Sequence, residues 1–215
     1  MHIPDGFLDL KTCLTTYLMS GAALSYGIKK LKNNFSEKNI PVLGILGAFI
    51  FAAQMINIPI GFGTSGHLMG GVLAMLVLGP WSASLIITSI LVIQSVFFMD
   101  GGILALGANV LNMALIQVWA GYFIYNFLTK LNFSEKLSII ITGLSATVIS
   151  AAFAAFELSF SNIVNLNLIL GAMVGWHTLI GLMEGVITML VLSYLNKTIS
   201  TQFELAYQKG GVNNA

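Results

Sequence analysis

The sequence has few charges, no arginine and a single cysteine. Only 8% of its 215 residues are charged and 57% are hydrophobic, whereas about 25% of a typical soluble domain is charged. Long uncharged stretches of this kind need lipid as their solvent. A net charge of +1 provides no basic surface for nucleic acid, and Cys13 alone excludes an internal disulfide.

Apolar stretches long enough to cross a bilayer recur along the chain. A span needs about 20 mostly apolar residues, and on this basis we expect an all-α polytopic membrane protein with about seven transmembrane helices. The third segment is short, and we expect it to meet the fourth at Gly79–Pro80, because proline ends a helix. The predicted segments are 8–28, 41–57, 66–78, 81–99, 103–128, 137–158 and 170–195.

The lysines predict the orientation of the chain in the membrane. All nine except Lys11 fall in three connections, 29–40, 129–136 and the tail from 196, and seven spans put these three on one side. Lysine-rich loops stay in the cytoplasm. We therefore expect a cytoplasmic C-terminus and an outer N-terminus in the cell inner (plasma) membrane. Residues 1–215 are expected to form one transmembrane domain with a cytoplasmic tail at 196–215.

The N-terminal segment, residues 1–7 (MHIPDGF), contains three nitrogens that can hold one metal ion. We expect bulky His2 to prevent removal of Met1. The Met1 amine and the His2 amide nitrogen then close a five-membered ring with the metal, and the His2 amide and Nδ1 close a six-membered ring. The planar peptide keeps these nitrogens nearly coplanar. One further imidazole would complete a square plane, which indicates Ni(II) or Cu(II) rather than zinc.

His67 is the natural fourth donor. It follows the glycine-rich loop 61–66, whose backbone can approach other elements closely. Carboxylates predicted on the same outer side, such as Asp100, attract cations. Each histidine taken alone is equally compatible with a surface residue or a hydrogen-bonded helix cap. Their shared position on one face makes Met1, His2 and His67 the predicted metal ligands.

Further short motifs are spread along the chain. After residues 1–7 come Ile58-Pro59, Gly63-Thr64-Ser65-Gly66-His67, Leu78-Gly79-Pro80-Trp81, Asp100-Gly101-Gly102 and Leu106-Gly107-Ala108-Asn109. Together they resemble the NikM and CbiM proteins, the substrate-binding components of nickel and cobalt energy-coupling-factor (ECF) transporters. The resemblance covers nearly the whole chain. Pro4-Asp5 places it nearer the nickel branch, with a cobalt importer subunit as the alternative.

The resemblance implies both a function and a set of partners. It implies that nitrogens of Met1, His2 and His67 hold Ni(II), or alternatively Co(II), as a transported substrate captured outside and delivered inward. It also implies a transmembrane coupling protein, a cytoplasmic ATPase pair and a small accessory membrane protein as partners. The chain itself would then not be an enzyme, and it has no phosphate-binding GxxxxGK[ST] loop.

Small residues spaced four apart predict close helix contacts in lipid. Gly44, Ala48 and Ala52 resemble the alanine stripe by which the family meets its coupling protein, and we predict a partner interface there. Ordinary internal packing would give the same stripe. In the last segment, close packing within the bundle is the preferred interpretation for four glycines, Gly171, Gly175, Gly181 and Gly185.

The remaining polar residues of the spans leave alternatives open. His177 and Glu184 share a helix face. They either line an ion path or are buried and hydrogen-bonded to neighbouring helices, and we favour the second interpretation. Asn109 and Asn112 are expected to orient loop backbone or a ligating histidine.

Two other protein classes are alternatives to a metal carrier. A rhomboid-like intramembrane serine protease would use Ser65 of the GxSG sequence as nucleophile and His177 as its base. The arginine and the oxyanion residues expected of that class are missing. A secondary transporter is a further alternative, although the sequence shows no internal repeat.

Overall fold

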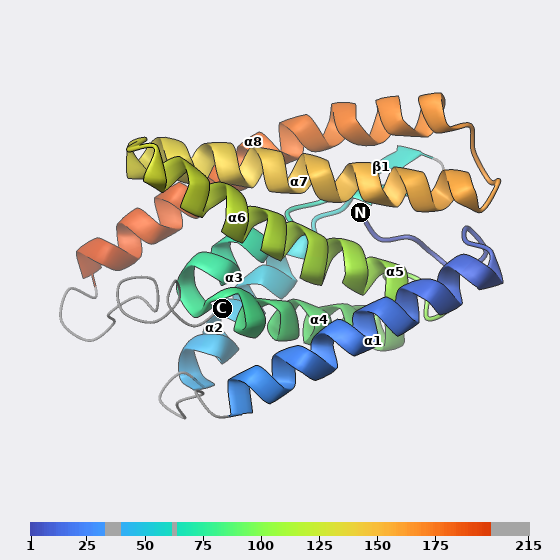
Figure 1. Cartoon of the computed structure of the whole chain (residues 1–215), viewed down its shortest axis with the longest axis horizontal. Coiled ribbons are helices and arrows are strands. Elements are labelled where there is room, and N and C mark those ends of the chain that lie inside the picture. Colours follow the sequence, from blue (N-terminus) through green and yellow to red (C-terminus); the bar gives the residue numbers. More distant parts are fainter. Residues whose placement is uncertain (33–39, 62–63, 199–215) are drawn as a thin grey trace.

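Long helices make up most of the computed structural model (Figure 1), which describes residues 1–32, 40–61 and 64–198. Two short antiparallel strands, β1 (Ile58–Gly61) and β2 (Thr64–Gly66), precede the third helix. A four-residue helix, α5 (Leu106–Asn109), continues into a π-helical segment, η2 (Val110–Ile116). The remaining helices are α1 (Leu10–Lys32), α2 (Ile40–Gln54), α3 (Gly71–Leu78), α4 (Pro80–Phe97), α6 (Gln117–Lys130), α7 (Glu135–Phe160) and α8 (Leu166–Thr198).

The prediction of a mostly helical membrane protein is confirmed. Each of the seven predicted segments contains a helix. Among the described residues, four helical stretches are long and apolar enough to cross a membrane: Pro80–Phe97, Leu106–Lys130, Glu135–Phe160 and Leu166–Lys197. Helix α2 is also apolar but has only 15 residues. Seven spans therefore remain a prediction.

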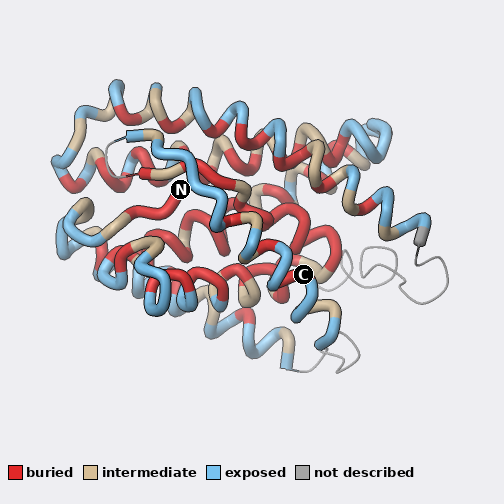
Figure 2. Tube along the Cα trace, turned by 180° about the vertical axis from the view of Figure 1, so that it is seen from behind, coloured by how far each residue is buried: buried red, intermediate tan, exposed pale blue. Residues whose placement is uncertain are grey.

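The third predicted segment begins differently from the expectation. Residues 64–66 form strand β2, and helix α3 starts only at Gly71. Its 8 residues give a length of about 12 Å, less than half of the ~30 Å hydrocarbon core of a bilayer. The helix is buried from Gly71 to Val77 and lies inside the bundle (Figure 2). It is therefore part of the core and is too short to cross a bilayer by itself.

Large hydrophobic side chains are exposed on the outer faces of the helices. Leu18 of α1, Ile45 of α2 and Phe160 of α7 are each about three-quarters exposed. Exposed apolar surface of this extent is unusual for a protein in water. In a bilayer these side chains meet lipid, which agrees with the low charge of the sequence.

Helices α7 and α8 run side by side with glycine at their contact (Figure 1). A Cβ added to Gly143 would lie 2.5 Å from the Cα of Gly185, and one added to Gly185 would lie 2.6 Å from the carbonyl oxygen of Ile140. The close packing expected of Gly181 and Gly185 is therefore present. The same expectation is wrong for Gly171 and Gly175, where a Cβ would meet nothing within 4 Å.

We predict that Gly185→Ala destabilises the protein by roughly 1–3 kcal/mol, because the new methyl group would press on backbone that cannot move aside. Gly175→Ala, on the same helix, should leave stability unchanged or slightly raised. Thermal unfolding of the purified protein in detergent compares the two. Equal melting temperatures would contradict the tight α7–α8 contact.

Candidate metal centre

The N-terminal segment runs into the middle of the bundle, where the chain end lies beside α7 (Figure 1). Met1 is 1% exposed, His2 4% and Ile3 0%. The hydroxyl of Ser150, on α7, lies 3.7 Å from the Met1 sulfur. A charged or solvated chain end would not be stable at such depth, so the Met1 amine must be neutral or bound to a partner.

Asn109 fixes the path of this segment. The backbone N–H of Ile3 donates to Asn109 Oδ1 at 2.8 Å, and Asn109 Nδ2 donates to the Ile3 carbonyl at 3.0 Å. The N–H of Gly102 also donates to this carbonyl, at 2.9 Å. The prediction that Asn109 orients loop backbone is confirmed. Asn112 instead donates to the Glu157 carboxylate at 2.6 Å.

Asp5 has a role that the sequence did not reveal. Residues 5 and 6 form a turn, with Gly6 at φ 87°. The Asp5 carboxylate then accepts hydrogen bonds from the N–H groups that lead into α5, those of Ile103 (3.1 Å), Leu104 (2.7 Å) and Ala105 (3.2 Å). Asp5 thereby anchors the N-terminal segment, and its oxygens are already engaged instead of being free to attract cations.

The two predicted histidine ligands meet in the structure. The rings of His2 and His67 stack, with centroids 4.6 Å apart and planes 23° from parallel. His67 is 3% exposed, and its Nδ1 lies 2.8 Å from the carbonyl oxygen of Leu68. This carbonyl requires a proton on Nδ1, so the Nε2 of neutral His67 carries its lone pair.

Each of the two imidazole rings at this centre has a nitrogen that is not hydrogen-bonded. Within the described ranges, neither His2 Nε2 nor His67 Nε2 has a hydrogen-bond partner. Asp100 Oδ2 lies 3.7 Å from His2 Nε2, which is too long for a hydrogen bond, and it accepts one from Asn57 at 2.9 Å. The free Nε2 of His67, whose Nδ1 is engaged by Leu68, is a nitrogen that can bind a metal.

Glycine leaves room for the His2 ring. Gly101 adopts φ 92°, and a Cβ placed on it would lie 3.2 Å from His2 Nδ1. A Cβ on Gly102 would lie 2.1 Å from an oxygen of Asp5. The sequence 100–102 therefore has a steric role beside the N-terminal segment, which motif matching alone did not explain.

Burial sets the protonation state of the candidate donors. It lowers the pKa of the Met1 amine well below its ordinary value, against the raising effect of Asp100. Burial and then the charge of the Met1 amine lower the pKa of both His2 and His67. Burial therefore favours the neutral form of all three groups, which is the form that binds metal ions.

Side chains alone do not make a conventional metal site in the part of the chain that the structure describes. No group of three or more His, Cys, Asp or Glu residues there could hold a metal ion. The candidate donor set is therefore two imidazoles together with main-chain nitrogens of Met1 and His2. The structure brings these three residues together, as the sequence predicted.

The geometry does not favour a serine protease. Ser65 Oγ and His177 Nε2 both lack a hydrogen-bond partner among the residues described, whereas a nucleophile needs its base within hydrogen-bonding reach. Gly63 of the GxSG sequence lies outside the described residues. His177 is buried, and its Nδ1 lies 2.8 Å from the Met173 carbonyl of its own helix. The expected burial of His177 is confirmed, whereas the expected hydrogen bond to a neighbouring helix is not present among the described residues.

Known proteins similar to this chain are metal transporters. A family model described as a cobalt uptake substrate-specific transmembrane region matches residues 2–201. The chain is 44% identical over 197 residues to a putative fused nickel transport protein of Archaeoglobus fulgidus, covering 91% of this chain and 65% of that relative. It is 32% identical over 163 residues to a putative cobalt transport protein of Methanosphaera stadtmanae, covering 75% of this chain and 73% of that relative.

A solved structure is also similar. The crystal structure of a truncated transition metal transporter matches with a TM-score of 0.87 and 38% identity, over 92% of this chain and 99% of the other. These similar proteins are named as transport proteins and not as enzymes. The chain spans less than two thirds of the length of the Archaeoglobus relative.

We predict that acid destabilises the metal-free protein through its buried nitrogens. Their folded-state pKa values are lowered, so unfolding takes up protons below the ordinary values of about 6.5 for histidine and about 8 for an α-amine. This stability is complete above about pH 8 and is lost as the pH falls toward 5. Thermal unfolding at several pH values should show a smaller loss in a His2→Gln, His67→Gln variant. An equal loss in both proteins would contradict the buried neutral site.

Proposed function

Because this chain belongs to the CbiM family of cobalt uptake substrate-specific transmembrane regions, we propose that it is the substrate-binding subunit of an ECF-type importer. It captures Ni(II) from outside the cell and delivers it inward when partner ATPases supply the energy. The observation that carries this proposal is the buried meeting of Met1, His2 and His67, with a His67 Nε2 that lacks a hydrogen-bond partner among the described residues.

The metal is the transported substrate, and its proposed ligands are four nitrogens. The Met1 amine, the His2 amide and His2 Nδ1 supply three of them in adjoining chelate rings. His67 Nε2 supplies the fourth, since His67 Nδ1 is engaged by the Leu68 carbonyl. Binding displaces the proton of the amide nitrogen, so affinity rises with pH.

Nickel is the proposed metal, with cobalt as the alternative. A planar set of four nitrogens favours Ni(II) over Mg(II), Ca(II) and Zn(II). The relative named for nickel transport is 44% identical and the relative named for cobalt transport 32%, which supports the same choice. Cu(II) binds such a site at least as tightly, and selectivity against copper must arise elsewhere.

The proposed topology in the plasma membrane has seven spans, with the N-terminus outside the cell and the C-terminus in the cytoplasm. The C-terminal ends of α1, α6 and α8, which carry Lys29, Lys130 and Lys197, all point toward the left side of Figure 1. The turn between α7 and α8 lies at the opposite end. This segregation supports the orientation by the positive-inside rule. The proposed tail at 196–215 lies mostly outside the described residues, as do Lys38 and Lys209.

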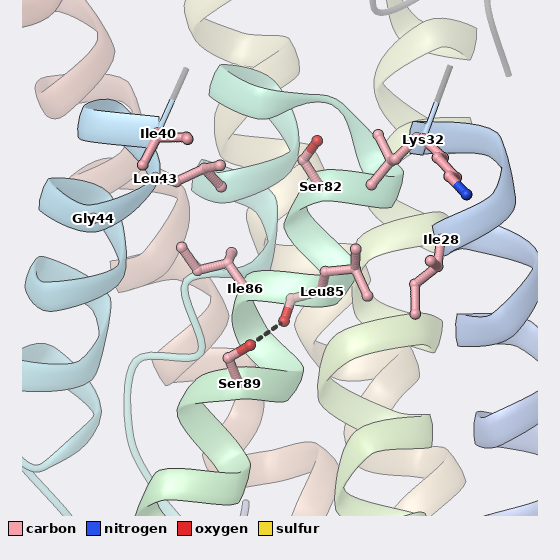
Figure 3. Close-up of a pocket in the computed structure, with 10 residues that line it drawn as sticks. Ile28, Lys32, Ile40, Leu43, Gly44, Ser82, Leu85, Ile86 and Ser89 are labelled. Atoms are coloured by element: carbon pink, nitrogen blue, oxygen red, sulfur yellow. Dashed lines mark hydrogen bonds between the residues drawn. The ribbon is translucent and has the colours of Figure 1, made fainter. Parts of the chain in front are cut away.

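The proposed partners are a transmembrane coupling protein, an ATPase pair and a small accessory membrane protein. Gly44, Ala48 and Ala52 are all exposed on α2, which favours a partner interface over internal packing of this stripe. Gly44 also lines an apolar groove of about 610 Å³ between α1, α2 and α4, with Ile28 and Ile86 on its walls (Figure 3). A helix of the coupling protein can approach closely along such a surface.

The first experiment is metal analysis by mass spectrometry of protein purified with a native N-terminus. We expect nearly stoichiometric nickel, lost in His2→Ala and in His67→Ala because each removes a ligand. A one-residue N-terminal extension should have the same effect, since it converts the amine into an amide. Stoichiometric cobalt would move the protein to the cobalt alternative. Failure to bind either ion would overturn the proposed function.

We expect Ala48→Phe to impair uptake without impairing capture. The bulky ring would hold the coupling protein away from α2, and cellular nickel uptake with the partners present should fall on the order of tenfold, the effect of about 1.4 kcal/mol of lost association energy. Nickel content of the purified variant should stay at the wild-type level. Ala22→Phe, at an exposed alanine of α1, is the matched control. Normal uptake by the Ala48 variant would remove the stripe from the interface.

A further inference from the structure

Glu184 is a fully buried carboxylate on α8, with an exposed fraction of 0%. The side-chain amide of Gln117, on α6, donates to it at 2.9 Å, and the hydroxyl of Thr147, on α7, lies 3.4 Å away. No salt bridge to Glu184 occurs within the described segments. Ionisable groups inside a membrane protein are costly and need a reason to be there.

Glu184 also binds backbone at the start of α3. Its carboxylate accepts a hydrogen bond from the N–H of Met69 at 3.0 Å, and the N–H groups of Gly70 and Val72 lie near it. These groups lie at the start of α3, whose N-cap is Gly70 and has no side chain. The first N–H groups of a helix need acceptors and favour a negative charge. Glu184 supplies both from another helix.

The capped backbone directly follows His67. Met69 is two residues after His67, and both its backbone N–H and its carbonyl are hydrogen-bonded. Glu184 binds its N–H, while Gln54 of α2 donates to its carbonyl at 2.6 Å. The intervening Leu68 carbonyl fixes the His67 ring through Nδ1. The direction of His67 Nε2 is therefore set by backbone that Glu184 anchors.

Helix α8 also contacts the chain on the N-terminal side of His67. A Cβ added to Gly66 would lie 2.4 Å from Cδ1 of Ile180, so the residue before His67 packs directly on α8. Ile180 and Glu184 are four residues apart and share one helix face. A single face of α8 thus contacts the chain immediately before and after the histidine.

We propose that Glu184 is a positioning residue for metal capture, holding residues 68–72 so that His67 Nε2 completes the coordination of the metal. This inference rests on the proposed function. Through Glu184, the metal site is joined to α8 and, by Gln117 and Thr147, to α6 and α7. Removing the carboxylate leaves the α3 cap without its acceptor, and the loop can then turn His67 away from the metal.

The test uses Cu(II) as a spectroscopic probe of the full-length protein with a native N-terminus. The hyperfine pattern of bound Cu(II) in electron paramagnetic resonance distinguishes four nitrogen ligands from three. We expect four in the wild type and three in both His67→Ala and Glu184→Ala. Glu184→Gln, which keeps one acceptor oxygen, should recover the four-nitrogen signal.

Nickel affinity, measured by titration with Ni(II) alone, gives a second readout. Glu184→Ala should weaken binding roughly 10–100-fold, as loss of a group that orients a ligand commonly does. In the His67→Ala background, where the comparison uses Cu(II) affinity, the same change should have little effect, since Glu184 acts through His67. Thr188→Val is the matched control, because Thr188 is buried one turn further along α8, and it should bind nickel like the wild type.

The outcomes separate this inference from the proposed function. A wild-type protein that binds neither Ni(II) nor Cu(II) overturns both. A wild type with four nitrogens, together with an unchanged signal and affinity in Glu184→Ala, overturns only the role of Glu184. An equal loss of affinity with and without His67 also overturns it, because Glu184 would then act on the fold in general. If Glu184→Ala does not fold, Gln54→Met, which removes the donor to the Met69 carbonyl, tests the same hold on residues 68–72, and wild-type affinity in it would overturn the role.

Discussion

Everything at the candidate metal centre depends on a chain terminus buried in the core of a membrane protein. Bringing the first three residues inward removes an amine and several peptide groups from water, which is costly unless each finds a partner. Asn109 satisfies both backbone groups of Ile3, and Asp5 closes the entry by accepting three N–H groups near α5. These hydrogen bonds therefore satisfy backbone groups, and none of them engages a nitrogen of Met1 or His2.

The second half of the centre depends on an interruption of helical structure. A continuous helix over 66–78 would have pointed His67 according to helical geometry alone. Instead, strand β2 and the irregular residues 67–70 place His67 against the His2 ring. Gly70, at φ 75°, then turns the chain into α3. A side chain at Gly70 would lie 2.6 Å from Ile50. Irregular backbone at this depth is tolerated because neighbouring helices satisfy its polar groups.

Those neighbouring helices use buried amides and carboxylates for the purpose. Gln54 and Glu184 hold the Met69 peptide, and Gln117 links Glu184 to α6. In a bilayer, apolar packing between helices is no better than packing against lipid, so directional polar contacts and close glycine approaches fix the arrangement. The contact of Gly143 with Gly185 fixes α7 against α8 in the same way. The fixed position of α8 in turn fixes the loop that carries His67.

The amino-acid sequence by itself determined the class of protein, the approximate position of every helix and the three candidate ligands. Low charge, long apolar segments and the unusual start Met1-His2 are local properties, and they can be recognised without knowing the fold. The same holds for the capacity of the first two residues to chelate, which follows from covalent geometry. Close packing at Gly181 and Gly185 was also foreseen, although the identical argument failed at Gly171 and Gly175.

Only the tertiary structure decided how these parts are assembled. It showed that α3 is a short buried helix and that Asp5 binds the backbone leading into α5. It also showed that Glu184 binds backbone at the start of α3, more than a hundred residues away in sequence. Hydropathy cannot separate a buried apolar helix from one that faces lipid, because both lack charge. Nor can a pattern reveal which backbone groups a carboxylate will satisfy, since these partners exist only once the chain has folded.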